Sequence, residues 1–310
     1  MEGLLGNPQI LSLVILLVIL PLVWYFYRQG NANGPGSGSI LGRYSRDLTK
    51  LAVEKKLDPV IGREQEIARV IQILSRRNKN NPVLIGNAGV GKTAVAEGLA
   101  IRIANKEVPP ALYHKRVIAL DLTGILAGTK YRGEFEQRLK KITDEIVSSH
   151  RTIILFIDEI HILAEAGEAE GAINAADILK PLLARGDLQV VGATTREEYL
   201  KFIKQDKTLD RRLQPVVVIE PTKAETKEIL NGIKNVYEKY HNVAIAPEAI
   251  TAAIVATEKI KGRSYPDKAI DAIDEACSRV RLKSINLSKA NITLKVTAAD
   301  IRQVVSEWLV

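Results

Sequence analysis

One octapeptide constrains the fold of this 310-residue chain more than any other segment: Gly86-Asn87-Ala88-Gly89-Val90-Gly91-Lys92-Thr93. It fits the pattern G-x-x-x-x-G-K-[ST], and it stands between an apolar run typical of a strand and a run typical of a helix. In that setting successive backbone N–H groups curl around phosphate oxygens, and the first turn of the helix adds a favourable dipole. We expect Lys92 to reach the β- and γ-phosphates of a nucleotide and the Thr93 hydroxyl to bind Mg²⁺.

Apolar runs and amphipathic runs alternate on both sides of this loop. Runs typical of buried strands cover residues 82–85, 117–120, 152–157, 189–193 and 216–219. Helical periodicity marks the stretches between them, such as residues 67–76, 93–104 and 134–147. This alternation predicts an α/β sandwich around a parallel sheet over residues 41–220. Beyond Pro221 the strand pattern stops, which predicts a small all-α domain over residues 221–310.

Two carboxylates follow one of the expected buried strands. The sequence Ile153-Ile154-Leu155-Phe156-Ile157 runs directly into Asp158 and Glu159, about sixty residues after the phosphate loop. We expect Asp158 to hold Mg²⁺, directly or through water, and Glu159 to orient and polarise an attacking water as a general base.

The N-terminal segment differs in kind from the rest of the chain. Residues 4–27 contain no charge, and the eighteen residues 10–27 would span roughly 27 Å as a helix, close to the thickness of the hydrocarbon core of a bilayer. A single-pass membrane anchor over residues 1–29 is therefore expected, with a cleaved signal peptide or a buried core helix as the alternatives. Lys and Arg follow the segment but do not precede it, so the body is expected in the cytoplasm. The Gly- and Ser-rich residues 30–40 predict a flexible linker.

Composition excludes some classes of protein. A single cysteine, Cys277, rules out an internal disulfide and a cysteine-based zinc site. The formal charge of +8 raises nucleic acid as a partner, but the excess is dispersed. Its densest cluster, residues 76–79, has no interleaved aromatic residues, so no nucleic-acid partner is expected.

Seven motifs in order resemble the first ATPase module of the Clp/Hsp100 AAA+ unfoldases, the ClpA, ClpB and ClpC group. They are DPVIGREQEI (58–67), LIGNAGVGKT (84–93), AGTKYRGEFEQRL (127–139), LFIDEIHIL (155–163), GATTREEY (192–199), LDRRLQPVVV (209–218) and SYPDKAIDAIDEA (264–276). The resemblance covers residues 41–310 and implies a P-loop AAA+ domain with a helical lid, which binds ATP and Mg²⁺ and hydrolyses ATP.

The resemblance also implies roles for single residues. Val60 and Ile61 match the segment that lines the adenine site, and Pro266 matches the lid position beside the nucleotide. Thr194 matches the sensor that hydrogen-bonds near the γ-phosphate and the attacking water. Arg211 and Arg212 match the finger that reaches the nucleotide of a neighbouring subunit, so a homo-oligomeric ring, usually a hexamer, is implied. Which of the two arginines is the finger stays open.

Residues 128–133 match the pore loop that grips polypeptide substrates in this family. Glycines at both ends favour mobility, and between them one aromatic residue lies between two cations: Lys130, Tyr131 and Arg132. A second, weaker match to a pore loop covers residues 165–171.

The sequence departs from the family in several places. Tyr265 stands where some AAA+ modules carry a lid arginine, which leaves the lid contact to the γ-phosphate unassigned. The coiled-coil middle domain is absent, and the second module that would dock a ClpP-type peptidase does not follow, so that partner is not supported. A membrane-anchored unfoldase or remodelling ATPase is the expected function. The alternatives are a nucleotide-gated membrane scaffold without threading, or part of a longer two-ring machine.

Overall fold

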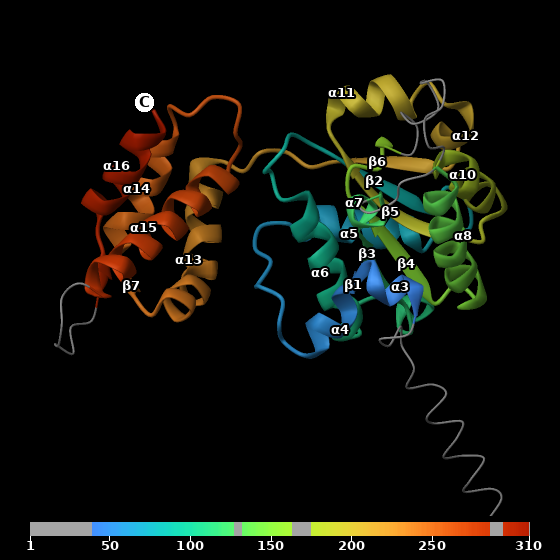
Figure 1. Cartoon of the computed structure of the whole chain (residues 1–310), viewed down its shortest axis with the longest axis horizontal. Coiled ribbons are helices and arrows are strands. Elements are labelled where there is room, and N and C mark those ends of the chain that lie inside the picture. The colour runs from blue at the N-terminus through green and yellow to red at the C-terminus, as the bar shows by residue number, and fades with distance from the viewer. Residues whose placement is uncertain (1–38, 127–131, 163–174, 286–293, 310) are drawn as a thin grey trace, which may run out of the picture. The chain divides into compact units, whose positions relative to one another are not determined.

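The computed structural model of the protein describes residues 39–126, 132–162, 175–285 and 294–309 (Figure 1). The chain divides into two units, Met1–Arg43 and Tyr44–Val310, and the described part of the first consists of Ser39 and the short helix α3 (Ile40–Arg43). The expected anchor over residues 4–27 and the linker up to residue 38 lie outside the described residues. Within the described ranges, no helix is both long and apolar enough to cross a lipid bilayer.

A six-stranded sheet forms the centre of the second unit. Its strands, given in chain order, are β1 (Ser45–Asp47), β2 (Asn81–Ile85), β3 (Arg116–Leu120), β4 (Ile153–Ile157), β5 (Gln189–Thr194) and β6 (Leu213–Val217). In space the order is β1-β3-β4-β5-β2-β6, and every neighbouring pair is parallel except β1 with β3. All residues of β2 and β4 are buried, as expected for strands of a parallel sheet covered on both faces. The predicted parallel sheet is confirmed.

Two details of the sheet differ from the sequence prediction. Strand β1 was not predicted, because its three residues, Ser-Arg-Asp, carry no apolar pattern. Strand β6 begins at Leu213 rather than at residue 216, and it includes Pro215, which lies opposite Val83 of β2. Because β6 is an edge strand, a residue without an N–H group can occupy it.

Helices cover both faces of the sheet (Figure 1). One group packs together and against the sheet: α4 (Leu48–Val53), α5 (Glu64–Leu74) and α6 (Lys92–Ala104). A second group packs together on the other side: α7 (Leu122–Leu126), α8 (Arg132–Ser148) and α10 (Ala175–Arg185). Shorter helical segments complete the domain: η2 (Pro110–Leu112), α11 (Arg196–Glu198), η3 (Tyr199–Ile203) and α12 (Lys207–Asp210).

The residues after the sheet form a helical lid with its own core. Its helices are α13 (Lys223–His241), α14 (Pro247–Thr257), α15 (Asp267–Ile285) and α16 (Ala298–Trp308). Capping boxes start two of them, Thr222 with Glu225 at α13 and Thr297 with Asp300 at α16, and Pro247 opens α14. The prediction of an all-helical lid needs one correction, because β7 (Ala244–Ile245) and β8 (Lys295–Val296) pair in parallel. Two-residue strands are too short to leave a periodic signal in the sequence.

Candidate functional site

The phosphate loop connects the buried strand β2 to helix α6. The helix begins at Lys92 directly after Gly91, whose φ of 96° lies in the left-handed region that favours glycine. Gly86 leaves β2 so close to β6 that a Cβ atom there would lie 2.4 Å from the carbonyl oxygen of Val218. A larger residue would clash with the backbone at Gly86, and at Gly91 it would be strained by the positive φ, so the glycine pattern that predicted the loop has a steric cause in the structure.

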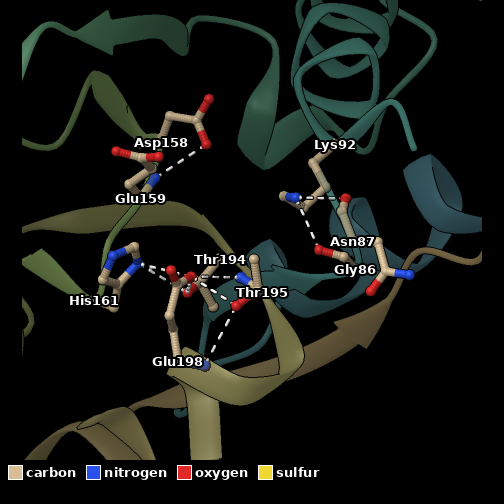
Figure 2. A network of polar contacts seen from close by, with 9 residues as sticks. All are labelled: Gly86, Asn87, Lys92, Asp158, Glu159, His161, Thr194, Thr195 and Glu198. Carbon is tan, nitrogen blue, oxygen red and sulfur yellow. Dashed lines mark hydrogen bonds and ion pairs between the residues drawn. The ribbon is translucent and has the colours of Figure 1, made fainter. Parts of the chain in front are cut away.

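The Lys92 side chain closes this loop on itself. Its Nζ donates to the carbonyl oxygens of Gly86 and Asn87, each at 2.9 Å (Figure 2). Burial lowers the pKa of Lys92, while the charges of Asp158, Glu198 and Glu159 act in the opposite direction. The three carboxylates thus favour the charged form of Lys92, although none of them forms an ion pair with it in the described part of the chain.

A cavity of about 500 Å³ opens beside the loop. Ala88, Gly89, Val90, Gly91, Lys92 and Thr93 of the loop line it, whereas Gly86 and Asn87 line a neighbouring groove. The predicted adenine-site residues Val60 and Ile61 also line the cavity, and so does Pro266. Aliphatic side chains of the lid add to this part of the lining: Ile229, Ile233 and Ile270. The cavity thus combines an apolar wall, suited to a nucleobase, with a cationic, amide-rich phosphate loop.

The acidic pair lies at the end of β4 and lines the same cavity. Glu159 has a φ of 50°, which is uncommon for a residue other than glycine, and its N–H donates to Asp158 Oδ1 at 3.0 Å. The next residue, Ile160, donates its N–H to the carbonyl oxygen of Ala193 in β5 at 2.9 Å, which fixes the turn to the sheet. Both carboxylates are exposed to the cavity rather than neutralised by a cation of the described residues.

The donor set fits Mg²⁺ bound together with a nucleotide. Within the described residues, no cluster of three or more His, Cys, Asp or Glu side chains could hold a metal ion by itself. Mg²⁺ does not need one, since it takes one or two protein ligands and completes its shell with phosphate oxygens and water. The Thr93 hydroxyl and the Asp158 carboxylate both line the cavity and are ligands of the required kind.

Thr194 lies at the end of β5, between the loop and the acidic turn. It pairs with Ile85 of β2, its carbonyl oxygen accepts from the N–H of Gly86 at 3.2 Å, and the residue is 1% exposed. Its hydroxyl donates to Glu198 Oε2 at 3.1 Å and lies 3.1 Å from Nδ1 of His161 (Figure 2). The structure therefore brings together the phosphate loop, the acidic pair and Thr194 in one cavity.

Of two other groups of predicted residues, one lies outside the cavity lining and the other falls mainly outside the described residues. Arg211 and Arg212 follow α12 and do not line the cavity. Neither guanidinium forms a hydrogen bond or ion pair with the part of the chain that the structure describes. Lys130 and Tyr131 of the expected pore loop, and residues 165–171, lie outside the described residues. Arg132 is the first residue of α8.

Sequence reasoning missed Arg63, Glu97 and Glu198, which line the cavity, and His161, which lies behind Thr194 outside the lining. Arg63 is 5% exposed, and its Nη2 donates to the carbonyl oxygens of Val90 at 2.6 Å and Ile219 at 3.1 Å. It therefore connects the phosphate loop to the segment that follows β6. Glu97 lines the cavity, and burial raises the pKa of its carboxyl group. His161 and Glu198 surround Thr194. Of these, Glu198 had a readable signal, because Thr195 and Glu198 have the spacing of a capping box.

Comparison with known proteins gives matches over most of the chain. The model of the ATPase family associated with various cellular activities (AAA) matches residues 82–220, and the AAA lid domain matches residues 222–307. The ATP-dependent Clp protease ATP-binding subunit ClpA homolog of Cyanidium caldarium is 55% identical over 281 residues, which are 90% of this chain and 33% of that protein. The chaperone protein ClpB of Oceanobacillus iheyensis is 59% identical over 258 residues, 83% of this chain and 31% of that protein.

The fold of the chain is also similar to that of solved structures. The S. cerevisiae Hsp104–ADP complex matches with a TM-score of 0.77 at 42% identity, covering 87% of this chain and 45% of that chain. The chain spans about a third of the length of the two curated relatives.

Proposed function

Because the chain belongs to the Clp/Hsp100 family of AAA+ ATPases, we propose that it binds ATP with Mg²⁺ in this cavity and couples hydrolysis to pulling on polypeptides. One observation carries the proposal. The phosphate loop follows β2, the Asp158–Glu159 pair follows β4, and Thr194 is the last residue of β5, which lies between the other two strands in the sheet. Their side chains therefore meet at the carboxyl end of a parallel sheet, where ligands of open α/β folds bind.

Each of these residues is proposed to have a role in nucleotide binding or hydrolysis that fits its position in the cavity. Backbone N–H groups of the loop and the Lys92 ammonium bind the phosphates, while Thr93 and Asp158 hold the Mg²⁺. When bound, the ion neutralises charge on the phosphate oxygens. Glu159 orients the attacking water and accepts its proton, and the Thr194 hydroxyl donates to the terminal phosphate.

Arg211 and Arg212 are proposed to act on the nucleotide of a neighbouring subunit. Their place outside the lining of their own cavity, with guanidinium groups unpaired by described residues, supports a role in trans. An arginine supplied by a neighbour stabilises charge in phosphoryl transfer. This part of the proposal makes the active form a ring, with a hexamer as the expected size.

Replacement of Glu159 by Gln tests the catalytic assignment. The amide cannot accept the proton of the attacking water, so turnover should fall at least about 100-fold, while ATP affinity changes less than about twofold. Calorimetric titration with MgATP and a phosphate-release assay measure the two quantities. Glu197→Gln is the matched control, because Glu197 is exposed and lies outside the cavity. Unchanged turnover in Glu159→Gln would refute the assignment.

The polypeptide-pulling role is proposed for the loop that contains Lys130, Tyr131 and Arg132. An aromatic side chain between two cations can press against any unfolded chain without sequence preference. Tyr131→Ala should therefore keep ATP turnover and lose unfolding of a tagged substrate. A variant that unfolds the substrate normally would refute the role of Tyr131, whereas a wild-type chain that hydrolyses ATP but unfolds no substrate would favour the nucleotide-gated scaffold.

Residues 4–27 are proposed to anchor the ATPase body to the cytoplasmic face of a membrane as a single-pass helix. The proposal rests on an uncharged run of sufficient length, with basic residues on its C-terminal side. Flotation of the full chain with lipid vesicles, compared with residues 41–310, tests it. Equal flotation of the two chains would contradict the anchor.

A further inference from the structure

The Glu198 carboxylate gathers four donors on a single oxygen. Its Oε2 lies 3.0 Å from the N–H nitrogen of Thr195, 2.8 Å from the Thr195 hydroxyl, 3.1 Å from the Thr194 hydroxyl and 3.2 Å from Nδ1 of His161 (Figure 2). The first two contacts belong to the capping box of α11. The other two connect Glu198 to the proposed sensor and to the turn after the acidic pair.

A second capping box in the same chain shows what capping alone requires. At the start of α13, Glu225 Oε2 accepts from the Thr222 N–H at 2.7 Å and from the Thr222 hydroxyl at 2.8 Å. No further hydrogen bond of that carboxylate is seen with the residues that the structure describes. The contacts of Glu198 with Thr194 and His161 therefore go beyond what a capping residue needs.

The chemistry of the four groups fixes where the protons lie. Burial raises the pKa of Glu198, but the hydrogen bonds from Thr195, aided by His161 and Thr194, hold it below its ordinary value, so the carboxylate is charged. A charged carboxylate only accepts, so Nδ1 of His161 carries a proton and donates. The Thr194 hydroxyl has its single proton directed to Glu198, and its oxygen accepts from His161.

Packing holds this arrangement in place. His161 is 7% exposed, and its ring stacks on Phe202 with centroids 6.1 Å apart and an interplanar angle of 23°. Thr194 is fixed through its backbone by the pairing of β5 with β2. The position of the Thr194 oxygen is thus set from two sides, while its O–H bond stays free to rotate about Cβ–Oγ1.

We propose that Glu198 and His161 are positioning residues for the Thr194 hydroxyl: His161 fixes the oxygen, and Glu198 holds the proton until a terminal phosphate is present to accept it. The exchange needs no backbone movement. Glu198 keeps three of its four donors when the hydroxyl turns away, so the loss to the carboxylate is small. This inference rests on the proposed ATPase function.

Glu198→Gln tests the inference, with Glu225→Gln as the matched control. Glutamine preserves the capping pattern at both sites, but its neutral oxygen is a weaker acceptor for Thr194 and His161. In nucleotide-free protein, ¹⁵N NMR of the histidine rings should show the Nδ1–H form of His161 in the wild type and in Glu225→Gln, and its loss in Glu198→Gln. The Nε2–H form in the wild type would overturn the proposal without any variant.

Nucleotide binding and turnover give the second readout. Glu198→Gln should lower kcat about tenfold, with KM changed less than about threefold, and bring the ratio of ATP to ADP affinity closer to one. In a Thr194→Val background it should have no further effect, because the hydroxyl that it positions is gone. Additive effects of the two changes, or equal behaviour of Glu198→Gln and Glu225→Gln, would refute the positioning role. Absence of turnover in the wild type would instead contradict the proposed function, and the NMR measurement would still test the inference.

Discussion

The α/β domain and the lid line one cavity with different chemistry. The α/β domain supplies polar groups such as Lys92, Asp158 and Thr194, which backbone pairing and turns hold at the ends of the strands. The lid supplies mainly aliphatic groups such as Ile229 and Ile233, whose position depends on how its helices pack. Hydrogen bonds therefore hold the side of the cavity proposed to bind the phosphates, and packing holds the side proposed to bind the base. Substitutions on the phosphate side should cause a large loss of nucleotide affinity, and substitutions on the base side should cause a smaller loss.

The largest effect is expected for Lys92→Met. Methionine keeps the length of the side chain but removes the cation, and loss of one partner in a desolvated charge-assisted contact costs roughly 2–5 kcal/mol. Affinity should fall at least about 100-fold for ATP and for inorganic triphosphate alike, as measured by calorimetry. Lys227→Met, at an exposed position of α13, is the control. A loss of ATP affinity without a loss of triphosphate affinity would contradict the assignment of Lys92 to the phosphates.

A smaller effect is expected for Gly232→Ala in the lid. The new Cβ atom would lie 1.6 Å from Cδ1 of Ile61, so Ile61 must turn away from its present position in the cavity wall. ATP affinity should fall about tenfold, because one lost aliphatic contact costs roughly 1–3 kcal/mol, and triphosphate affinity should stay the same. Gly133→Ala serves as the control, since no atom of the residues that the structure describes lies within 4 Å of a Cβ placed there. Equal losses for the two ligands would mean that the lid side is not the base side.

The smallest effect is expected for the free energy of unfolding at alkaline pH, through a thiol in the core of the lid. Burial raises the pKa of the Cys277 thiol from 9.0 to about 12, and the residue is fully buried. Between pH 9 and pH 12 the unfolded chain releases this proton while the folded lid keeps it, so the free energy of unfolding falls as pH rises, by at most about 1.4 kcal/mol per pH unit. Cys277→Ala should lose less stability than the wild type between pH 8 and pH 10 in urea titrations. Parallel losses in the two proteins would contradict burial of the thiol as the cause.

The phosphate side could be predicted because each of its two motifs is a short continuous segment of the sequence. The loop 86–93 and the pair 158–159 each follow an apolar run, and parallel strands bring their carboxyl ends to one edge. The base side could be predicted only where the family resemblance named it, at Val60, Ile61 and Pro266. Ile229, Ile233 and Tyr237 recur every four residues on α13, but such a stripe does not distinguish a ligand-facing surface from core.

His161 and Glu198 illustrate why the rest of the site was not predicted. Both are close in sequence to residues that were identified, Glu159 and Thr194, yet their contact with each other spans β4 and β5. Only the pairing of these strands, together with the short helix after β5, places a ring nitrogen 3.2 Å from a carboxylate oxygen. The edge strand β6 and the short strands β1, β7 and β8 were misplaced or missed for a related reason, since pairing rather than composition defines them.

The place of β2 in the sheet has a consequence for how the protein is made. Val83 pairs with Gly192 of β5 and with Pro215 of β6, and both partners are synthesised more than a hundred residues later. A ribosome therefore completes the phosphate-loop strand long before the strands that flank it exist, and long-range pairing of this kind is slow to form. We therefore expect nucleotide to contribute little to the early steps of folding. A nucleotide bound in the proposed site would stabilise the domain after β5 and β6 have paired with β2.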